Sequence, residues 1–198
     1  AKSYICQTKV NYLGHQVSSN GIEMVDDYVN LVVNWPKPQT PKELATFLGK
    51  TGYYRQFIQD YSKIAACLEG EKKKPQLIWT PQIDKSFVIL KESFLKKPIL
   101  AFPQFGTGEP FIMDADWCQE GMAQALSQNQ SMEDGTRERL IAAGGRKCTT
   151  AERNYASNKG ETASFVDGLK RFEHILRYAP FKARVDNKCL SYIRNLKK

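Results

Sequence analysis

The 198-residue sequence lacks any long apolar run. No hydrophobic stretch approaches the roughly 18–20 residues that a membrane-spanning helix needs, so a membrane-spanning protein is not expected. The first residues, Ala1–Ile5, place no apolar stretch behind their basic residue and do not read as a secretory signal. The sequence also begins without Met, which predicts a processed or excised piece of a longer chain.

Cysteine and histidine are too scattered for the common metal and disulfide motifs. The five cysteines are odd in number and include no Cys-x-x-Cys pair, which favours free thiols in a reducing compartment. With only His15 and His174, a zinc site is not expected. Ser127 and Ser164 have no histidine neighbour that would complete a triad, and no Gly-x-x-x-x-Gly-Lys phosphate loop occurs. Serine hydrolysis and P-loop nucleotide hydrolysis are therefore unsupported.

What the sequence does have is an ordinary globular composition with an excess of positive charge. Hydrophobic residues make up 41% and charged residues 25%. There are 29 Lys+Arg against 21 Asp+Glu, a formal net charge of +8. The length allows one large or two small domains, at roughly 100–200 residues per domain. The charge favours nucleic acid or another polyanion as a partner, but it says nothing about the fold.

The first part of the chain predicts a hairpin followed by helices. Residues 4–17 alternate like a hairpin with Gly14 between its arms, and Asn20-Gly21 is a strong turn signal. A helix is expected from Asp26 until Trp35-Pro36 stops it.

A second helix is predicted over residues 40–61, because Thr40-Pro41-Lys42-Glu43 forms a capping box. Gly49 and Gly52 lie inside this helix at a cost of up to about 1 kcal/mol each, which indicates that something approaches the backbone closely there. The neighbouring aromatic and basic side chains fit either a nucleic-acid contact or, more simply, the core.

The second part predicts a mixed α/β layer. Residues 71–75 read as a solvated linker, and a helix is expected from Thr80-Pro81 to Lys97-Pro98. Beyond it we expect strands over 110–116, 121–128, 140–143 and 181–185, a helix over 149–176 with Phe165, Leu169, Phe172 and Leu176 as its apolar stripe, and a last helix from Asp186. The order β-β-β-α-β-α is that of an α/β (α+β) domain with a helix crossing between strands.

Three carboxylates occupy positions where a catalytic or metal-binding role is plausible. Asp116 ends the first of these strands, Glu161 lies on the long helix, and Asp186 follows the fourth strand. Acids at neighbouring strand ends can converge, and such a cluster needs a cation to neutralise it. Oxygen ligands without His or Cys point to Mg²⁺ or Mn²⁺. The alternative stays open that three acids near element ends arise by chance, since Asp favours caps and turns.

Several motifs resemble the reverse transcriptases of gypsy-type LTR retrotransposons and retroviruses. They follow in the family's order along nearly the whole chain: Tyr12–Ser18 with Asn20–Ile22, Trp35-Pro36-x-Pro38, Glu43–Gly49, Gly52–Ile58, Tyr61–Ala65, Trp79-Thr80, Pro98–Leu100, Phe111-Ile112-x-x-x-Asp116, Leu126–Gln128, Ala151–Tyr155, and Val185-Asp186-x-Lys188. The resemblance implies four segments: the end of the palm with the primer-grip hairpin (1–24), a helical thumb (25–70), a linker with a connecting helix (71–105), and a ribonuclease H-like mixed sheet with flanking helices (106–198), incomplete at its C-terminal end.

The resemblance also implies roles for individual residues. Asp116, Glu161 and Asp186 fall on the catalytic acids that hold Mg²⁺ (or Mn²⁺) for hydrolysis of RNA in an RNA–DNA hybrid. Contacts to nucleic acid are implied for Tyr12, Leu13, Gly14, His15, Gly49, Lys50, Gly52, Tyr53 and Arg55. The implied partners are an RNA–DNA hybrid or template–primer duplex, the fingers and palm of the same polyprotein, and a second copy in a dimer. The implied location is a cytoplasmic retroelement particle or virion, with access to the nucleus.

The sequence departs from the family at several points. The paired palm aspartates are absent, so the chain alone is not expected to polymerise, and it ends before the expected last helix and fourth acid. Trp117-Cys118 replaces a small Ala-Ser after Asp116, where a Trp is expected to crowd the metals, and Gly160 precedes Glu161 where stronger helix formers are usual. Two hypotheses follow: a metal-dependent nuclease fragment, or a catalytically inactive module, either a tether or a domesticated retroelement remnant, that binds nucleic acid or a subunit.

Overall fold

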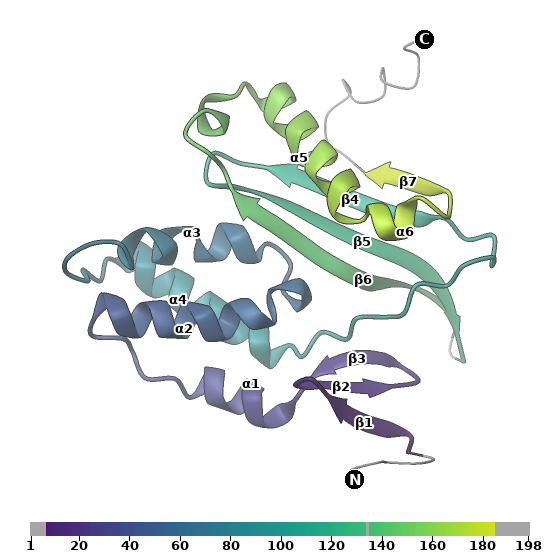
Figure 1. Ribbon diagram of the computed structural model, residues 1–198, viewed down its shortest axis with the longest axis horizontal. Helices are drawn as coiled ribbons and strands as arrows, with labels where there is room; N and C mark the ends of the chain where they lie inside the picture. Colours follow the sequence, from purple (N-terminus) through teal and green to yellow (C-terminus); the bar gives the residue numbers. More distant parts are fainter. Residues whose placement is uncertain (1–6, 134, 185–198) are drawn as a thin grey trace. The chain divides into compact units, whose positions relative to one another are not determined.

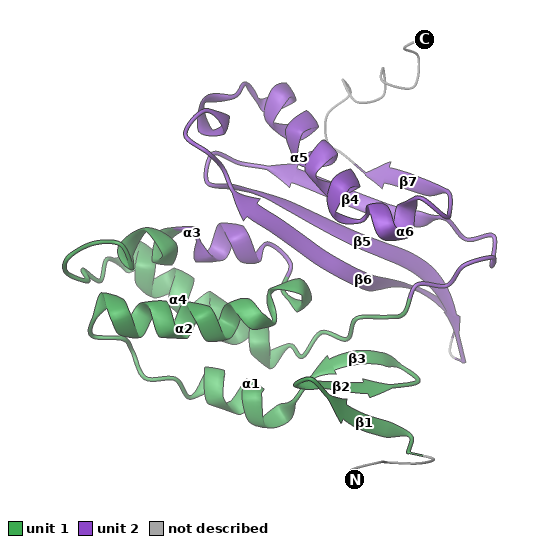
Figure 2. Cartoon of the chain, in the orientation of Figure 1, with its two compact units in different colours: residues 1–58, 67–102 green, residues 59–66, 103–198 purple. Residues whose placement is uncertain are grey.

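The computed structural model describes residues 7–133 and 135–184, and these divide into two compact units (Figures 1 and 2). Unit one comprises residues 1–58 and 67–102, and unit two comprises residues 59–66 and 103–198. Helix α3 (Tyr61–Glu71) therefore contributes its first half to unit two and its second half to unit one. Within the described ranges, no helix has the length and apolar character required to cross a membrane.

Unit one begins with an antiparallel meander. Strands β1 (Lys9–Tyr12), β2 (His15–Ser18) and β3 (Gly21–Met24) pair in the order β1-β2-β3. The β1–β2 turn is Leu13-Gly14, and both residues have positive φ (45° and 73°), as a two-residue type I′ turn requires. The predicted hairpin around Gly14 is therefore confirmed.

Four helical elements complete unit one: α1 (Asp26–Val33), α2 (Pro41–Tyr53), the short 3₁₀ helix η1 (Arg55–Phe57) and α4 (Pro81–Leu95), together with the second half of α3. Thr40 caps α2 by accepting a hydrogen bond from the Glu43 N–H (3.2 Å), and Thr80 caps α4 in the same way. Leu44, Phe47 and Leu90 are buried in the core between these helices. Both helix starts were predicted from their Thr-Pro signals.

Two sequence predictions about unit one's helices were wrong. The helix predicted over residues 40–61 ends at Tyr53, and α3 starts anew at Tyr61 after Asp60, whose φ of 58° is left-handed. The break occurs because Tyr54 is fully buried and its hydroxyl donates to the Gly14 carbonyl, which overrides the local helix pattern. Glu71, expected in a solvated linker, instead ends α3 with a buried side chain that pairs with Lys74.

Unit two is built on a four-stranded mixed sheet (Figure 1). Strands β4 (Phe111–Trp117), β5 (Gly121–Met132), β6 (Gly135–Lys147) and β7 (Phe181–Arg184) lie in the order β6-β5-β4-β7. The β4–β5 and β5–β6 pairs are antiparallel, and β7 is parallel to β4. Because a parallel pair needs a crossover, the chain returns from β6 to β7 through helices. The predicted fold class is confirmed, while the helix predicted from Asp186 lies outside the described residues.

The crossover consists of the 3₁₀ turn η2 (Glu152–Asn154), α5 (Ser157–Arg171) and α6 (Glu173–Leu176). The long helix was predicted to begin at Thr149, but Thr149 and Glu152 instead cap the 3₁₀ turn by a reciprocal pair of hydrogen bonds (2.8 and 3.3 Å).

The face that α5 turns to the sheet also differs from the prediction. The residues it buries are small: Gly160, Ser164 and Gly168. Phe165 and Leu169, predicted as part of the apolar stripe, are only half-buried, whereas Phe172 and Leu176 are buried as predicted. This face of α5 carries small residues because the helix lies close to β4, and a bulky side chain does not fit there.

Candidate nucleic-acid surface and acidic site

The β1–β2 turn is fastened to the end of α2 by two tyrosines. The Tyr53 hydroxyl donates to the Leu13 carbonyl, and the Tyr54 hydroxyl donates to the Gly14 carbonyl. His15 adds a hydrogen bond from its Nδ1 to the Leu13 carbonyl (3.0 Å). The turn is therefore held by hydrogen bonds to both of its carbonyl groups.

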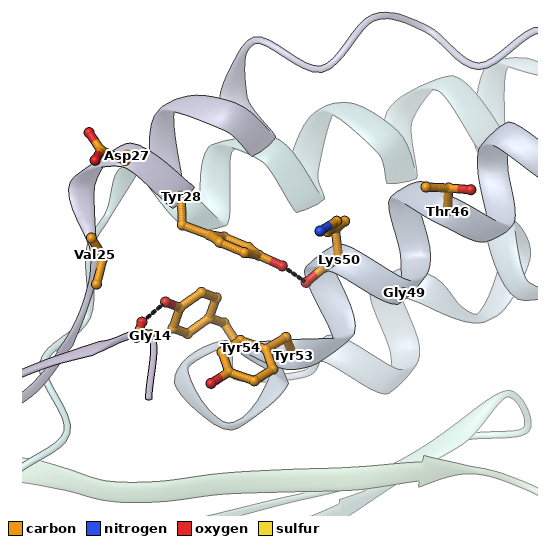
Figure 3. Close-up of a pocket in the computed structure, with 9 residues that line it drawn as sticks. All are labelled: Gly14, Val25, Asp27, Tyr28, Thr46, Gly49, Lys50, Tyr53 and Tyr54. Atoms are coloured by element: carbon orange, nitrogen blue, oxygen red, sulfur yellow. Dashed lines mark hydrogen bonds between the residues drawn. The ribbon is translucent and has the colours of Figure 1, made fainter. Parts of the chain in front are cut away.

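Beside this turn lies an open pocket of about 650 Å³ (Figure 3). It is lined mainly by apolar and aromatic groups, from Gly14, Val25, Asp27, Tyr28, Thr46, Gly49, Lys50, Tyr53 and Tyr54. Tyr28 donates to the Lys50 carbonyl (2.9 Å), and burial raises the pKa of Tyr28 and of Tyr54 above the ordinary phenol value. A Cβ at Gly49 would have nothing within 4 Å, so the α2 backbone is open to an approaching molecule there.

The structure brings together most of the residues predicted to contact nucleic acid. Gly14, Gly49, Lys50 and Tyr53 line the pocket, and Leu13, which is 70% exposed, stands at the turn. Three others lie around this set: Tyr12 is 65% exposed in β1, Gly52 is half-buried in the last turn of α2, and Arg55 is exposed in η1. Their roles in binding stay predictions.

His15 occupies a different environment from the other predicted contacts. Its ring lies among those of Tyr53, Tyr54 and Phe57, with centroids 5.2–5.6 Å away. It is half-buried, and its Nε2 is buried without a hydrogen-bond partner. Its contacts therefore support the turn from inside the unit.

Asp116 stands near the end of β4, where the sequence predicted it. Its carbonyl accepts a hydrogen bond from the Ser164 Oγ of α5 (2.8 Å), and its carboxylate, with the side chain 65% exposed, forms an ion pair with Lys63 of α3. Lys63 also pairs with Asp60 (3.4 Å). Desolvation favours the neutral amine, but the hydrogen bond to Asp116 and the charge of Asp60 outweigh it and raise the pKa of Lys63. Asp60 and Asp116 both line a hollow of about 530 Å³ on this unit.

Glu161 lies in the first half of α5. Its Oε1 accepts a hydrogen bond from the Ser157 Oγ (2.8 Å), while its Oε2 is buried without a donor. A buried carboxylate oxygen without a partner is costly unless a cation or water meets it. Asp186, the third predicted acid, lies outside the described residues, and within the described residues no three His, Cys, Asp or Glu side chains form a potential metal site. By donor chemistry Asp116 and Glu161 each suit a hard divalent cation, and the Glu161 Oε2 lacks a donor; that the two carboxylates converge on one ion stays a prediction.

Trp117 was expected to crowd this site, but its ring lies against α5 at Gly160. Successive strand residues point to opposite faces of a sheet, so the indole and the Asp116 carboxylate project on opposite sides of β4. The sequence held the signal for this arrangement in two departures from the family, a large residue after Asp116 and a glycine before Glu161.

Two arginine networks that the sequence did not reveal hold unit two together. Arg146 of β6 forms a bidentate pair with Glu152 (2.7 and 2.8 Å) and a further bond to Asp167 of α5 (2.8 Å). Its hydrogen bonds lower the pKa of Glu152 to about 2. Arg184 of β7 contacts Asp114 of β4 (2.7 Å) and Glu138 of β6 (2.6 Å), and thereby lowers the pKa of Glu138.

Comparison with known proteins accounts for this arrangement of strands and helices. Residues 79–183, just over half of the chain, match the family model described as the RNase H-like domain found in reverse transcriptase. The chain belongs to this family.

The curated proteins that are similar to this RNase H-like chain include retrotransposon polyproteins. The Retrovirus-related Pol polyprotein from transposon 297 of Drosophila melanogaster is 32% identical over 99% of this chain and 18% of its own length. The transposon opus polyprotein of the same organism is 31% identical over 96% of the chain and 20% of its length, and the Transposon Tf2-3 polyprotein of Schizosaccharomyces pombe is 26% identical over 96% and 14%. The chain thus spans a fifth or less of the length of these relatives.

Solved structures support the fold. The foamy viral protease-reverse transcriptase dRH in complex with double-stranded DNA matches with a TM-score of 0.74 at 15% identity, covering 96% of this chain and 33% of that one. The same enzyme in complex with an RNA/DNA hybrid matches with a TM-score of 0.71 at 16% identity, covering 94% and 25%. At this level of identity the likeness establishes the fold of the RNase H-like chain and leaves its activity to experiment.

Proposed function

We propose that this chain is the part of a retroelement reverse transcriptase that grips template–primer and hydrolyses the RNA strand of RNA–DNA hybrids at Asp116, Glu161 and Asp186. The observation that carries the proposal is the bond between the Asp116 carbonyl and the Ser164 Oγ, which ties the strand end with the first acid to the helix with the second. Family membership supports the same assignment.

In this proposal, Asp116 and Glu161 each supply a carboxylate oxygen to the divalent cation. The Asp116 carboxylate is exposed to solvent, and the Glu161 Oε2 is buried without a donor, so an oxygen of each side chain is available to coordinate a hard cation. Ser157 orients Glu161 through its Oε1. A bound Mg²⁺ or Mn²⁺ would supply charge stabilisation for phosphodiester displacement and a water activated for attack.

Unit one supplies the gripping surface in this proposal. Tyr12, Leu13 and Tyr53 expose apolar area at the turn, and Lys50 and Arg55 add positive charge along α2 and η1. Phosphate neutralisation by such side chains is independent of sequence and weakens steeply with salt. The foamy viral enzyme was solved with double-stranded DNA and with an RNA/DNA hybrid, which supports these two partners for this chain. The remaining polyprotein, including its palm and fingers, is a further proposed partner, and a retroelement particle is the proposed location.

Hydrolysis is tested by incubating the chain with labelled RNA–DNA hybrid and Mg²⁺. We expect the RNA strand to be cut, and we expect both Asp116→Asn and Glu161→Gln to abolish cutting. Asp114→Asn is the matched control, because Asp114 lies on the same strand but binds Arg184 and is expected to leave cutting intact. Absence of cleavage by the unmutated chain would rule out the nuclease assignment.

A second function is favoured by the ion pair between Lys63 and Asp116. An ammonium group that already neutralises the first acid suits a module that binds nucleic acid without cutting it. In that case the chain binds hybrid equally well with Mg²⁺ and with EDTA, its affinity falls between 50 and 200 mM salt, and no product forms. Binding that is indifferent to salt would contradict a phosphate-binding surface for either function.

A further inference from the structure

Helix α5 approaches β4 closely where the Trp117 ring lies against Gly160. A Cβ built at Gly160 would lie 2.2 Å from Cδ2, 2.4 Å from Cε2 and 2.6 Å from Cε3 of the indole. Any side chain other than hydrogen at this position would overlap the ring. Gly160 is buried in the middle of the first half of the helix, a position where glycine is unfavourable unless packing demands it.

This contact joins the residues that adjoin the two candidate acids in the sequence. Trp117 follows Asp116 in β4, and Gly160 precedes Glu161 in α5. One turn further along the helix, the hydrogen bond from the Ser164 Oγ to the Asp116 carbonyl (2.8 Å) joins the same two segments. The indole and this hydrogen bond are thus two supports that together set how closely the Glu161 turn approaches the strand end with Asp116.

We propose that Trp117 is a positioning residue of the acidic site, whose ring fills the space above Gly160 and fixes the separation between the backbones that carry Asp116 and Glu161. The inference rests on the proposed function, because it assigns Trp117 a purpose within that metal site. It also makes the two departures from the family complementary: the large residue after the first acid requires the small residue before the second.

The contact is tested with single variants and a matched control. Gly160→Ala forces the ring to move, and we expect it to lower the melting temperature of the chain and to weaken Mn²⁺ binding, measured by calorimetric titration, about tenfold. Gly168→Ala is the control: its Cβ would meet the Gln124 Cγ at 3.0 Å and the Met113 Sδ at 3.2 Å, two helical turns away from Gly160. We expect the control to lower the melting temperature while leaving the Mn²⁺ affinity unchanged, a split that a purely structural role of Gly160 would not produce.

A size swap gives the decisive comparison. Trp117→Ala removes the ring and is expected to weaken Mn²⁺ binding about tenfold, whereas the double variant Trp117→Ala with Gly160→Leu refills the gap from the helix side and is expected to recover most of the affinity. If either single variant fails to fold, the other single variant and the double variant still provide the comparison.

The outcomes separate the two claims. Unchanged Mn²⁺ affinity in Trp117→Ala, or no recovery in the double variant, overturns the positioning role and leaves the proposed nuclease site intact. An unmutated chain that binds no Mn²⁺ overturns the metal site itself, and the positioning role with it. A drop in affinity for Gly168→Ala equal to that for Gly160→Ala also overturns the proposal, because the effect would then be general to helix packing.

Discussion

The proposed gripping surface of unit one and the acidic site of unit two are held in place by different forces. In unit one, the Leu13-Gly14 turn is fixed by neutral hydrogen bonds from Tyr53 and Tyr54, within a cluster of aromatic rings. In unit two, the strands and α5 are joined by the charged networks of Arg146 and Arg184. Neutral contacts are insensitive to pH and salt, whereas paired carboxylates lose their stabilising effect when they are protonated.

The difference matches what each region has to present. A surface that meets a polyanion benefits from presenting positive charge to solvent, as Lys50 and Arg55 do on α2 and η1. A site that gathers acids instead needs nearby cations to stabilise them in the absence of metal, and Lys63 beside Asp116 has that position. Variants that remove either an ion pair or a neutral hydrogen bond therefore distinguish the two regions.

The largest effect is expected for Arg146→Met. It leaves the half-buried carboxylates of Glu152 and Asp167 without their main partner. We expect a loss of about 2–3 kcal/mol in the free energy of unfolding of unit two, below the roughly 3–5 kcal/mol of a fully buried pair because the Arg146 side chain is 36% exposed. Urea denaturation measures the loss. Arg177→Met is the matched control, because Arg177 and Glu173 form an exposed pair and should contribute little.

Acid should weaken unit two before unit one. The pKa of Glu152 is about 2 in the folded chain, below its ordinary value of 4.5, so its contribution is full above pH 4.5 and is lost as the pH falls towards 2. The lowered pKa of Glu138 acts in the same direction. In unit one, the pKa of Asp26 is also lowered, but this side chain is 71% exposed and contributes little.

Tryptophan fluorescence separates the two regions in this titration. Trp35 and Trp79 belong to unit one and Trp117 to unit two. A Trp35→Phe, Trp79→Phe double variant therefore reports on unit two alone, and a Trp117→Phe variant reports on unit one. Equal loss of both signals between pH 5 and 2 would contradict the assignment of charge-dependent stability to unit two.

In unit one, Tyr54→Phe is expected to have a smaller effect, about 1–2 kcal/mol. The variant keeps the ring of the fully buried Tyr54 but leaves the Gly14 carbonyl without its donor. The loss should be independent of pH between 4 and 8 and should weaken hybrid binding, because the turn is released. Tyr155→Phe, a tyrosine of unit two that stacks with Lys159, is the control. Unchanged hybrid affinity in Tyr54→Phe would separate the turn from binding.

Local signals predicted the parts of the structure that depend on neighbouring residues. The Thr-Pro starts of α2 and α4, the Gly14 turn and the position of Asp116 near the end of β4 all followed from short patterns. Each of these features is stabilised by contacts within a few residues, so the sequence pattern carries most of the information.

The features that were missed depend on distant partners. The end of α2 is set by a hydrogen bond between Tyr54 and Gly14, which are 40 residues apart, and the partner of Asp116 is Lys63, 53 residues away. The face of small residues on α5 was not predicted, because a search for hydrophobic periodicity favours large residues, while close contact with β4 requires Gly160 and Gly168. Such choices are made by tertiary packing and leave no trace in the periodicity of large hydrophobic residues.

The smallest change in stability is expected for Lys63→Met, and it tests whether this cation supports the acidic site or blocks it. The Asp116 side chain is 65% exposed, so the ion pair should contribute less than about 1 kcal/mol to folding. A divalent cation and the Lys63 ammonium compete for the same carboxylate, so removal of the charge should raise Mn²⁺ affinity a few-fold by calorimetric titration. Lys72→Met, which breaks the pair between Glu69 of α3 and Lys72 just beyond its end, is the control and should leave the affinity unchanged. A fall in Mn²⁺ affinity for Lys63→Met would instead mean that Lys63 holds Asp116 in position for the metal. The contrast between a surface whose cations meet a polyanion and an acidic site whose cation competes with metal would then have to be abandoned.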